Sequence, residues 1–131
     1  MSTYRSLTVL FMFFLFSCAG PVDRPDDALD CGRRFVENIY KGDFKHARQL
    51  VLNTPPNQEI LFGSIAKDYR SRDPFAQDKL RMESLVIHHF NTVGDTAAIL
   101  QFKNSYNGNR SSLKLTNQKG EWFVDLTNSN L

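Results

Sequence analysis

The sequence lacks an excess of charge of either sign, and it lacks long apolar runs. Its 131 residues carry 16 basic and 14 acidic side chains, and Lys and Arg form no continuous run. This balance argues against nucleic acid as a partner, because such binding needs a concentrated basic face. The apolar run of residues 7–17 would span roughly 16 Å as a helix, against roughly 30 Å for the hydrocarbon core of a bilayer. It is therefore too short to be a stable membrane span.

That apolar run has the length of the hydrophobic region of a secretory signal. The small residue Ser17 stands directly before Cys18, where a signal peptidase requires a small side chain. Leu15-Phe16-Ser17-Cys18 resembles the bacterial lipobox, in which an aliphatic, a variable and a small residue precede an invariant cysteine. The resemblance implies that residues 1–17 are a lipoprotein signal peptide and that Cys18 becomes a lipid thioether and the new N-terminus.

Lipidation of Cys18 predicts a place in the bacterial cell envelope, with the membrane as partner through the N-terminal lipid. We expect the outer membrane, on its periplasmic side. Each buried CH₂ contributes about 0.8 kcal/mol, so one acyl chain binds marginally, whereas two or three chains such as palmitate anchor a protein permanently. Two alternatives are an ordinary cleaved signal that leaves Cys18 as a spectator and an uncleaved anchor.

Cysteine is also scarce, since Cys18 and Cys31 are the two in the chain. Once Cys18 carries lipid, an intramolecular disulfide is excluded. We interpret Cys31 as a small buried apolar residue. A catalytic thiol is the alternative, but no histidine lies near Cys31 in the sequence.

Residues 18–131 are enough for one domain with a core but not for two. Gly20, Pro21 and Pro25 lie among charges, a composition that predicts a tether over residues 18–27. Apolar residues then recur at intervals of three and four, with Asp26-Asp27 and Asp43 at helix starts, where carboxylates cap free amides. Gly42, residues 53–56 and Asp73-Pro74 end or break the helical pattern. Three helices are predicted, over residues 26–41, 44–52 and 61–71.

Beyond Asp78 the apolar period falls towards two, which is typical of strands. Four strands are predicted, over residues 80–91, 96–106, 111–116 and 121–127. Their links are short, so neighbouring strands should pair antiparallel. The predicted fold class is α+β, with N-terminal helices packed on one face of a curved four-stranded antiparallel sheet.

Two stretches carry a resemblance to a known family. "FVENIYKGDFKHARQLV" (residues 35–51) and "GEWFVDL" (residues 120–126) look like the opening and the ending of small bacterial lipoproteins of unknown function with a nuclear-transport-factor-like (cystatin-like) domain. The resemblance covers nearly all of residues 28–127 and implies a cystatin-like α+β domain there. Its motifs are structural, so it implies no chemistry and no cofactor.

A pocket between the first helix and the sheet is one expectation. Alternation along residues 121–127 places Trp122 and Val124 on the face towards that helix. The candidates for lining such a pocket are Phe35, Leu100, Trp122 and Val124. For Trp122 we favour plain core over a ligand-binding wall.

No metal site is predicted. His88 and His89 are adjacent in a predicted strand, so they point to opposite faces and cannot bind one metal ion. His46 has no acidic or thiol partner four residues away in either direction. We interpret all three histidines as surface or core-edge residues.

The predicted function is that of a membrane-tethered, non-catalytic binding or protein-interaction module. The alternative is a small pocket enzyme that performs proton transfer or hydrolysis with Asp68, Tyr69, His88 and Asp125. Asp125 is out of phase with Trp122 and Val124 and is expected to face outward.

A homodimer is a further expectation. The outer face of the sheet carries Ile99 and Phe123, and exposed apolar groups on such a face commonly mark an interface. Cover by the tether is the competing explanation for these side chains.

Overall fold

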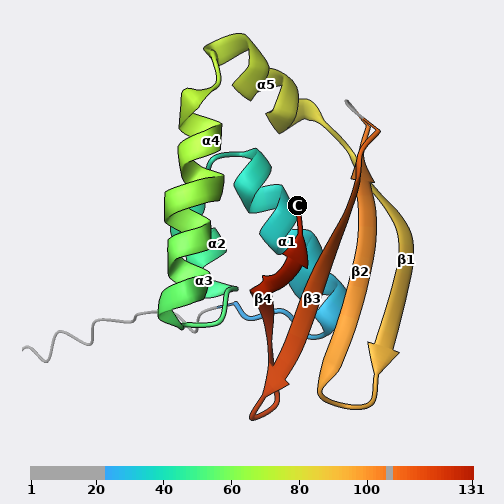
Figure 1. Cartoon of the computed structure of the whole chain (residues 1–131). Coiled ribbons are helices and arrows are strands. Elements are labelled where there is room, and N and C mark those ends of the chain that lie inside the picture. Colours follow the sequence, from blue (N-terminus) through green and yellow to red (C-terminus); the bar gives the residue numbers. More distant parts are fainter. Residues whose placement is uncertain (1–22, 106–107) are drawn as a thin grey trace, which may run out of the picture.

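The computed structural model describes residues 23–105 and 108–131 and shows an α+β arrangement (Figure 1). The first helices are α1 (Ala28–Tyr40) and α2 (Phe44–Gln49). Asp27 caps α1 by accepting a hydrogen bond from the Asp30 amide at 2.7 Å. Asp43 caps α2 by accepting one from the His46 amide at 3.2 Å. Carboxylates in these positions satisfy free amides and complement the helix dipole. Helix α2 begins at residue 44 as predicted, and α1 begins two residues after the predicted residue 26.

The turn between α1 and α2 requires glycine. Gly42 has a φ of +72°, and a β-carbon there would lie 2.5 Å from the Tyr69 ring. Any other residue would be strained by its backbone conformation and would displace Tyr69. The turn therefore brings the α1–α2 hairpin against the next helical segment.

That segment is longer than predicted. It runs through α3 (Pro55–Glu59), the π-helix η1 (Ile60–Ile65) and α4 (Ala66–Ser71). The prolines at residues 55–56, interpreted from sequence as a break, occupy the first turn of α3. Proline is well tolerated there because its missing N–H has no helical partner. The expected start at residue 61 was wrong for this reason.

Helix α5 (Pro74–Met82) was not predicted, and the expected strand start at residue 80 was wrong. Asp73 caps α5 by accepting from the Ala76 amide at 2.9 Å, and Pro74 opens its first turn. No residue of α5 is fully buried. Its sequence therefore carries no clear apolar stripe that would have indicated a helix.

The sheet has four antiparallel strands in the order β1-β2-β3-β4. They are β1 (Leu85–Val93), β2 (Ala97–Asn104), β3 (Arg110–Gln118) and β4 (Glu121–Asn130). Register shifts interrupt β1 between Ile87 and His89 and β3 between Ser112 and Lys114. The predicted α+β class with a four-stranded antiparallel sheet is confirmed.

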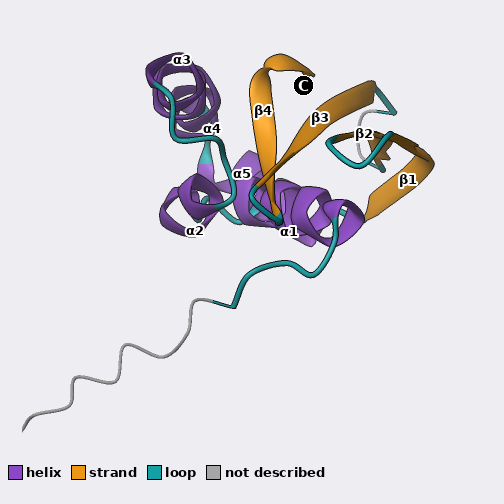
Figure 2. Ribbon diagram, turned by 90° about the horizontal axis from the view of Figure 1, so that it is seen from below, coloured by secondary structure: helices purple, strands orange, loops and turns teal. Residues whose placement is uncertain are grey.

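The core lies between α1 and the sheet. In Figure 2 the strands fan out on one side of α1, and this helix contacts all four of them. Gly32 allows the close approach, since a β-carbon there would lie 2.7 Å from Cδ2 of Leu100. Side chains with no exposed surface fill the space: Cys31, Phe35, Val36, Leu100, Leu113, Leu115 and Val124.

The outer edge of β4 is covered by the chain that follows α2. Val51 forms a parallel bridge with Val124. The Leu52 amide donates to the Val124 carbonyl at 3.0 Å, and the Val124 amide donates to the Leu50 carbonyl at 2.7 Å. At Val124 this edge strand is therefore not free to pair with another chain.

Asp125 on β4 is buried, which corrects the expectation that it faces outward. Helix α3 packs against β4 at this point, and Asn57 of α3 donates to Asp125 Oδ1 at 3.5 Å. The Asp125 carboxylate also accepts from the Thr127 hydroxyl at 2.6 Å and from the Asn128 amide group at 2.9 Å. Its role is to hold the irregular C-terminal part of β4.

Candidate functional site

A cleft of about 630 Å³ opens at the end of the molecule where α1 ends and where α4, α5 and the start of β3 meet. Its apolar lining comes from Ile39, Ile65, Leu80 and Phe102. Its polar lining includes Tyr40, Ser64, Asn104, Asn109, Arg110 and Ser111. The volume lies within the range of small-molecule sites, and the lining combines apolar side chains with polar and charged ones.

The π-helix η1 shapes one wall of the cleft. Its last residues, Ser64 and Ile65, line the cleft, and Asp68, Tyr69 and Arg72 follow within and just after α4. Single π-helical turns frequently occur at functional sites. No signal in the sequence marked this segment as different from an ordinary helix.

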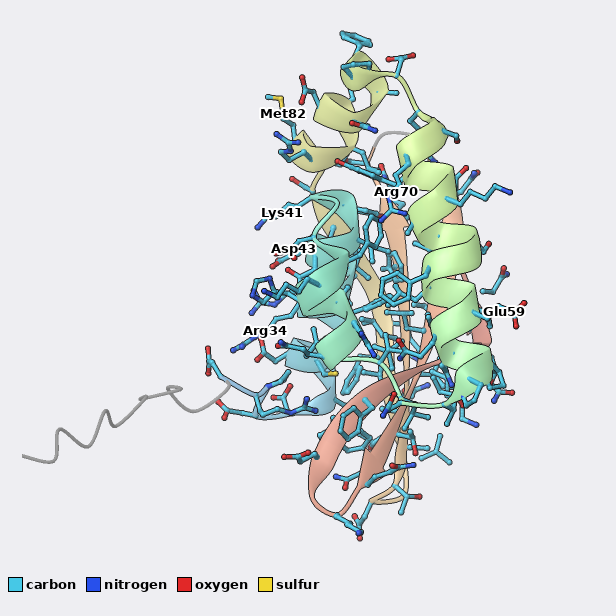
Figure 3. The ribbon with its side chains drawn as sticks, turned by 90° about the vertical axis from the view of Figure 1, so that its left-hand side faces the viewer. Arg34, Lys41, Asp43, Glu59, Arg70 and Met82 are labelled. Carbon is cyan, nitrogen blue, oxygen red and sulfur yellow. The ribbon has the colours of Figure 1, made fainter. Side chains whose placement is uncertain are left out.

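Helix α4 also contacts α2. Arg70 extends from α4 towards α2 (Figure 3), where its guanidinium lies 5.9 Å from the centroid of the Phe44 ring. The Phe44 ring also meets Tyr69 edge-on, with centroids 5.6 Å apart. These contacts position Tyr69 at the border of the cleft.

Charge inside the cleft is largely paired. Asp68 is the one acidic side chain among the described lining residues, and its Oδ2 lies 2.9 Å from Nη2 of Arg72. Arg110 forms no ion pair with a described carboxylate and is exposed. Burial raises the pKa of Tyr40 despite the hydrogen bond with Asn104, so its hydroxyl stays neutral. The polar part of the cleft therefore offers mainly neutral hydrogen-bonding groups and one unpaired guanidinium.

The residues predicted to line a pocket lie elsewhere. Phe35, Leu100 and Val124 are fully buried in the core, and Trp122 is half-buried against it. None of the four lines the cleft. The tight approach of α1 to the sheet at Gly32 fills the expected space, so these side chains form core instead of a pocket wall.

The four residues of the alternative enzyme set are not brought together. Asp68 and Tyr69 both line the cleft, whereas His88 is exposed on β1 and Asp125 is held by its own neighbours. Within the described residues, no group of three or more His, Cys, Asp or Glu side chains could hold a metal ion.

His46 has an acidic partner that the sequence reasoning missed. Its Nδ1 lies 2.6 Å from Oδ2 of Asp43, three residues earlier. Asp43 is the cap of α2, and residues three apart on a helix are neighbours. The prediction considered only the positions four residues from His46 and therefore did not include Asp43. Both side chains are well exposed.

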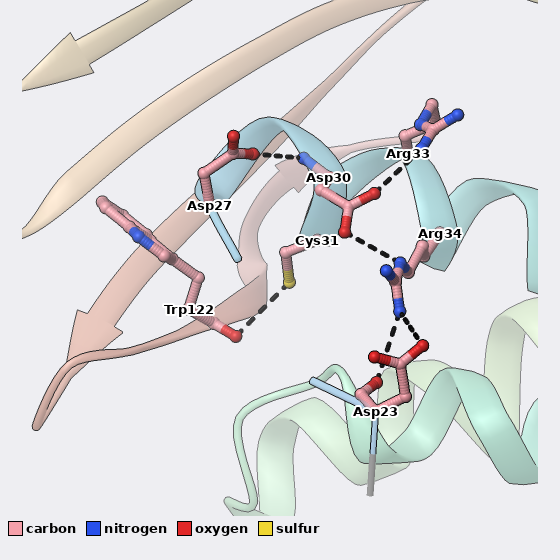
Figure 4. Close-up of polar contacts among 7 residues, drawn as sticks. All are labelled: Asp23, Asp27, Asp30, Cys31, Arg33, Arg34 and Trp122. Carbon is pink, nitrogen blue, oxygen red and sulfur yellow. Dashed lines mark hydrogen bonds and ion pairs between the residues drawn. The ribbon is translucent and has the colours of Figure 1, made fainter. Parts of the chain in front are cut away.

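Cys31 is fully buried, as expected. Its thiol donates to the Trp122 carbonyl at 3.4 Å (Figure 4). Burial raises the pKa of Cys31 to about 12, so the reactive thiolate is scarce at neutral pH.

The outer face of the sheet agrees with the expectation at Ile99 and differs from it at Phe123. Ile99 is 40% exposed. Phe123 is half-buried, and the Arg24 guanidinium lies 4.4 Å from its ring centroid. The competing explanation, cover by the tether, therefore holds for Phe123. Cys18, the predicted lipidation site, lies outside the described residues.

Comparisons of this chain with protein-family models, curated proteins and solved structures find no match in any of the three. No helix within residues 23–105 or 108–131 is both long and apolar enough to cross a bilayer.

Proposed function

We propose that this chain is a lipid-anchored protein of the bacterial cell envelope whose domain binds a small amphipathic ligand without transforming it. The domain is of the cystatin-like, nuclear-transport-factor-like kind. The lipobox-like Leu15-Phe16-Ser17-Cys18 stretch supports the anchor, and the order of helices before a four-stranded meander supports the fold family.

The cleft carries the binding part of this proposal. Leu80, Phe102 and Ile65 offer apolar surface, whereas Arg110 and Ser111 offer hydrogen bonds at the start of β3. A ligand with an apolar body and a polar end matches both.

The chemistry of the lining favours binding over catalysis. Asp68 is occupied by Arg72 at 2.9 Å. No histidine or cysteine belongs to the described lining, so Ser64 and Ser111 have no such base beside them to activate a hydroxyl.

A matched pair of variants on α5 tests the site. Leu80 lines the cleft, while Met82, two residues on, is 85% exposed and does not line it. We expect residues 18–131 to bind the amphipathic probe 1-anilinonaphthalene-8-sulfonate with one-to-one stoichiometry. Leu80→Arg should abolish this saturable binding, because the long cationic side chain fills the cleft.

The control Met82→Arg adds the same charge to the same helix and should bind the probe as the unchanged protein does. Equal binding by Leu80→Arg would refute the cleft as the site. Turnover of an ester or of a carbon acid that is lost with Asp68→Asn would instead favour the enzyme alternative.

A further inference from the structure

Residues 23–27, which the sequence assigns to the tether, are docked on the domain. The Arg24 side chain donates from Nη1 to the Gln49 carbonyl at 2.7 Å and from Nη2 to the Trp122 carbonyl at 3.1 Å. Its guanidinium also lies over the Phe123 ring, and its side chain is only 25% exposed. One arginine thus joins the tether to the end of α2 and to the start of β4.

Two further contacts hold the same segment, which we call the strap (residues 23–27). Nη1 of Arg34 on α1 donates to the Asp23 carboxylate at 3.2 Å and to the Asp23 carbonyl at 3.3 Å (Figure 4). Asp27 caps α1. The Asp23 side chain is 90% exposed, so the Arg24 contacts, to backbone carbonyls and an aromatic face, contribute more than this ion pair.

The strap lies at the opposite end of the domain from the cleft. It precedes the N-terminus of α1, whereas the cleft is lined by Ile39 and Tyr40 at the C-terminus of α1. Figure 1 shows α5 at one end of the molecule and the β1–β2 and β3–β4 turns at the other. Figure 2 shows the strap crossing the outer side of α1, away from the sheet. A chain attached to a surface through its N-terminus is therefore held beside α1 and α2, nearer to these turns than to α5.

The docked strap also shortens the stretch of chain between Cys18 and its first contact with the domain. At about 3.4 Å per extended residue, the stretch from Cys18 to Asp23 reaches at most about 17 Å, against about 34 Å for the stretch from Cys18 to Ala28. Undocking the strap would double the reach of the domain and remove the fixed exit point.

We propose that the strap makes the end of the domain with the β1–β2 and β3–β4 turns the surface that faces the lipid bilayer, so that the cleft opens away from the membrane. The attachment rests on the lipidation of Cys18 proposed above. The docking of the strap does not, since it rests on the Arg24 contacts. The partner of this surface is the headgroup layer of the bilayer.

Two labelling sites report the orientation. Lys119 lies in the β3–β4 turn and Phe75, 70% exposed, lies on α5. Each is changed to cysteine in the full chain, labelled with a thiol-reactive donor dye and reconstituted in phosphatidylethanolamine–phosphatidylglycerol vesicles that carry an acceptor dye on the lipid headgroups. Cys31 does not interfere, because its thiol is buried with a pKa raised to about 12.

We expect stronger energy transfer from the label at residue 119 than from the label at residue 75. Arg24→Ala should remove this difference, whereas Arg33→Ala should preserve it. Arg33 is an exposed arginine near the same end, paired with Asp30 at 2.9 Å and not with the strap. As a second variant that leaves every strap contact intact, a ten-residue Gly-Ser insertion after Val22 should weaken transfer from residue 119.

Each outcome is decisive. Equal transfer from the two positions in vesicle-bound protein, or no effect of Arg24→Ala, refutes the orientation and leaves the lipid anchor standing. Protein that does not float with the vesicles refutes the anchor and the orientation together. In that case, rapid hydrogen exchange at the strap amides, unchanged by Arg24→Ala, would additionally refute the docking.

Discussion

Asn57 on α3 accepts a hydrogen bond from the backbone amide of Leu126 on β4, with 2.6 Å between Oδ1 and N. Asn57 is 2% exposed, and its amide nitrogen also donates to the Thr54 hydroxyl at 2.9 Å. A buried side chain thus links the start of α3 to the last strand, in a region where β4 departs from regular pairing with β3.

Asn57→Ala should therefore lower the free energy of unfolding by about 1–3 kcal/mol, because it leaves the Leu126 amide buried without a partner. Urea unfolding measures the change. Glu59→Ala, at an exposed position of the same helix, is the control and should have little effect. Equal midpoints for the two variants would contradict the structural role of Asn57.

Asp125 should make stability depend on pH. Burial acts to raise its pKa, but hydrogen bonds from Thr127, Asn128 and Asn57 outweigh burial and leave the pKa below its ordinary value. A carboxyl group with a lowered folded-state pKa stabilises the fold above its unfolded pKa of about 3.9 and loses this contribution as the pH falls through the folded value. Unfolding midpoints measured between neutral and acidic pH should fall less steeply in Asp125→Asn than in the unchanged protein. Parallel curves would show that Asp125 does not contribute.

Phe35 and Trp122 should differ in their contributions to stability. Phe35 is fully buried, so Phe35→Ala should cost roughly 3–5 kcal/mol. Trp122 is half-buried at the margin of the core, so Trp122→Ala should cost less. Denaturant titration of both variants gives the order. A larger loss for Trp122→Ala would mean that the tryptophan is the main packing residue.

Cys18→Ala should release the protein from membranes or stall its processing, because no thiol remains at the lipobox position to accept lipid. Membrane fractionation and the mass of the mature chain measure both effects. Cys31→Ala is the matched control and should leave fractionation and processing unchanged. Unchanged partitioning and mass in Cys18→Ala would refute the lipid anchor.

A homodimer through the outer sheet face remains a prediction, now centred on Ile99 because Arg24 covers Phe123. Sedimentation of residues 19–131 should show a dimer, which Ile99→Glu should dissociate by placing a charge in the apolar contact. Met82→Glu on α5 serves as control. A monomer at every concentration tested would rule the interface out.

Much of the fold was predictable from periodicity and capping. The stripe that contains Phe35 and Val36, the Asp27 and Asp43 caps and the short strand links all act locally, so a single sequence expresses them. Helix α5 was missed because its residues are exposed or half-buried and its pattern carries no period. The start of α3 was missed because Pro55 was interpreted as a break and not as a first-turn residue.

The site was less predictable than the fold. The expected pocket failed because the distance between α1 and the sheet is set by Gly32 and Leu100, which are far apart in the sequence. The cleft depends on the π-helix and on α5, for which no sequence pattern was available. Asp68 and Tyr69 were named as candidates, but their place in one cleft with Leu80 and Arg110 required the packing of distant segments.

The two edges of the sheet are unequal, and this sets a limit on self-association. The backbone of residues 50–52 pairs with the outer edge of β4, while no described segment pairs with the outer edge of β1. Growth of a sheet into a fibre requires each subunit to offer two open edges, one for each neighbour. If two copies join through β1, each end of the resulting eight-stranded sheet is a β4 edge that is already bridged at Val124, which disfavours further edge-to-edge pairing.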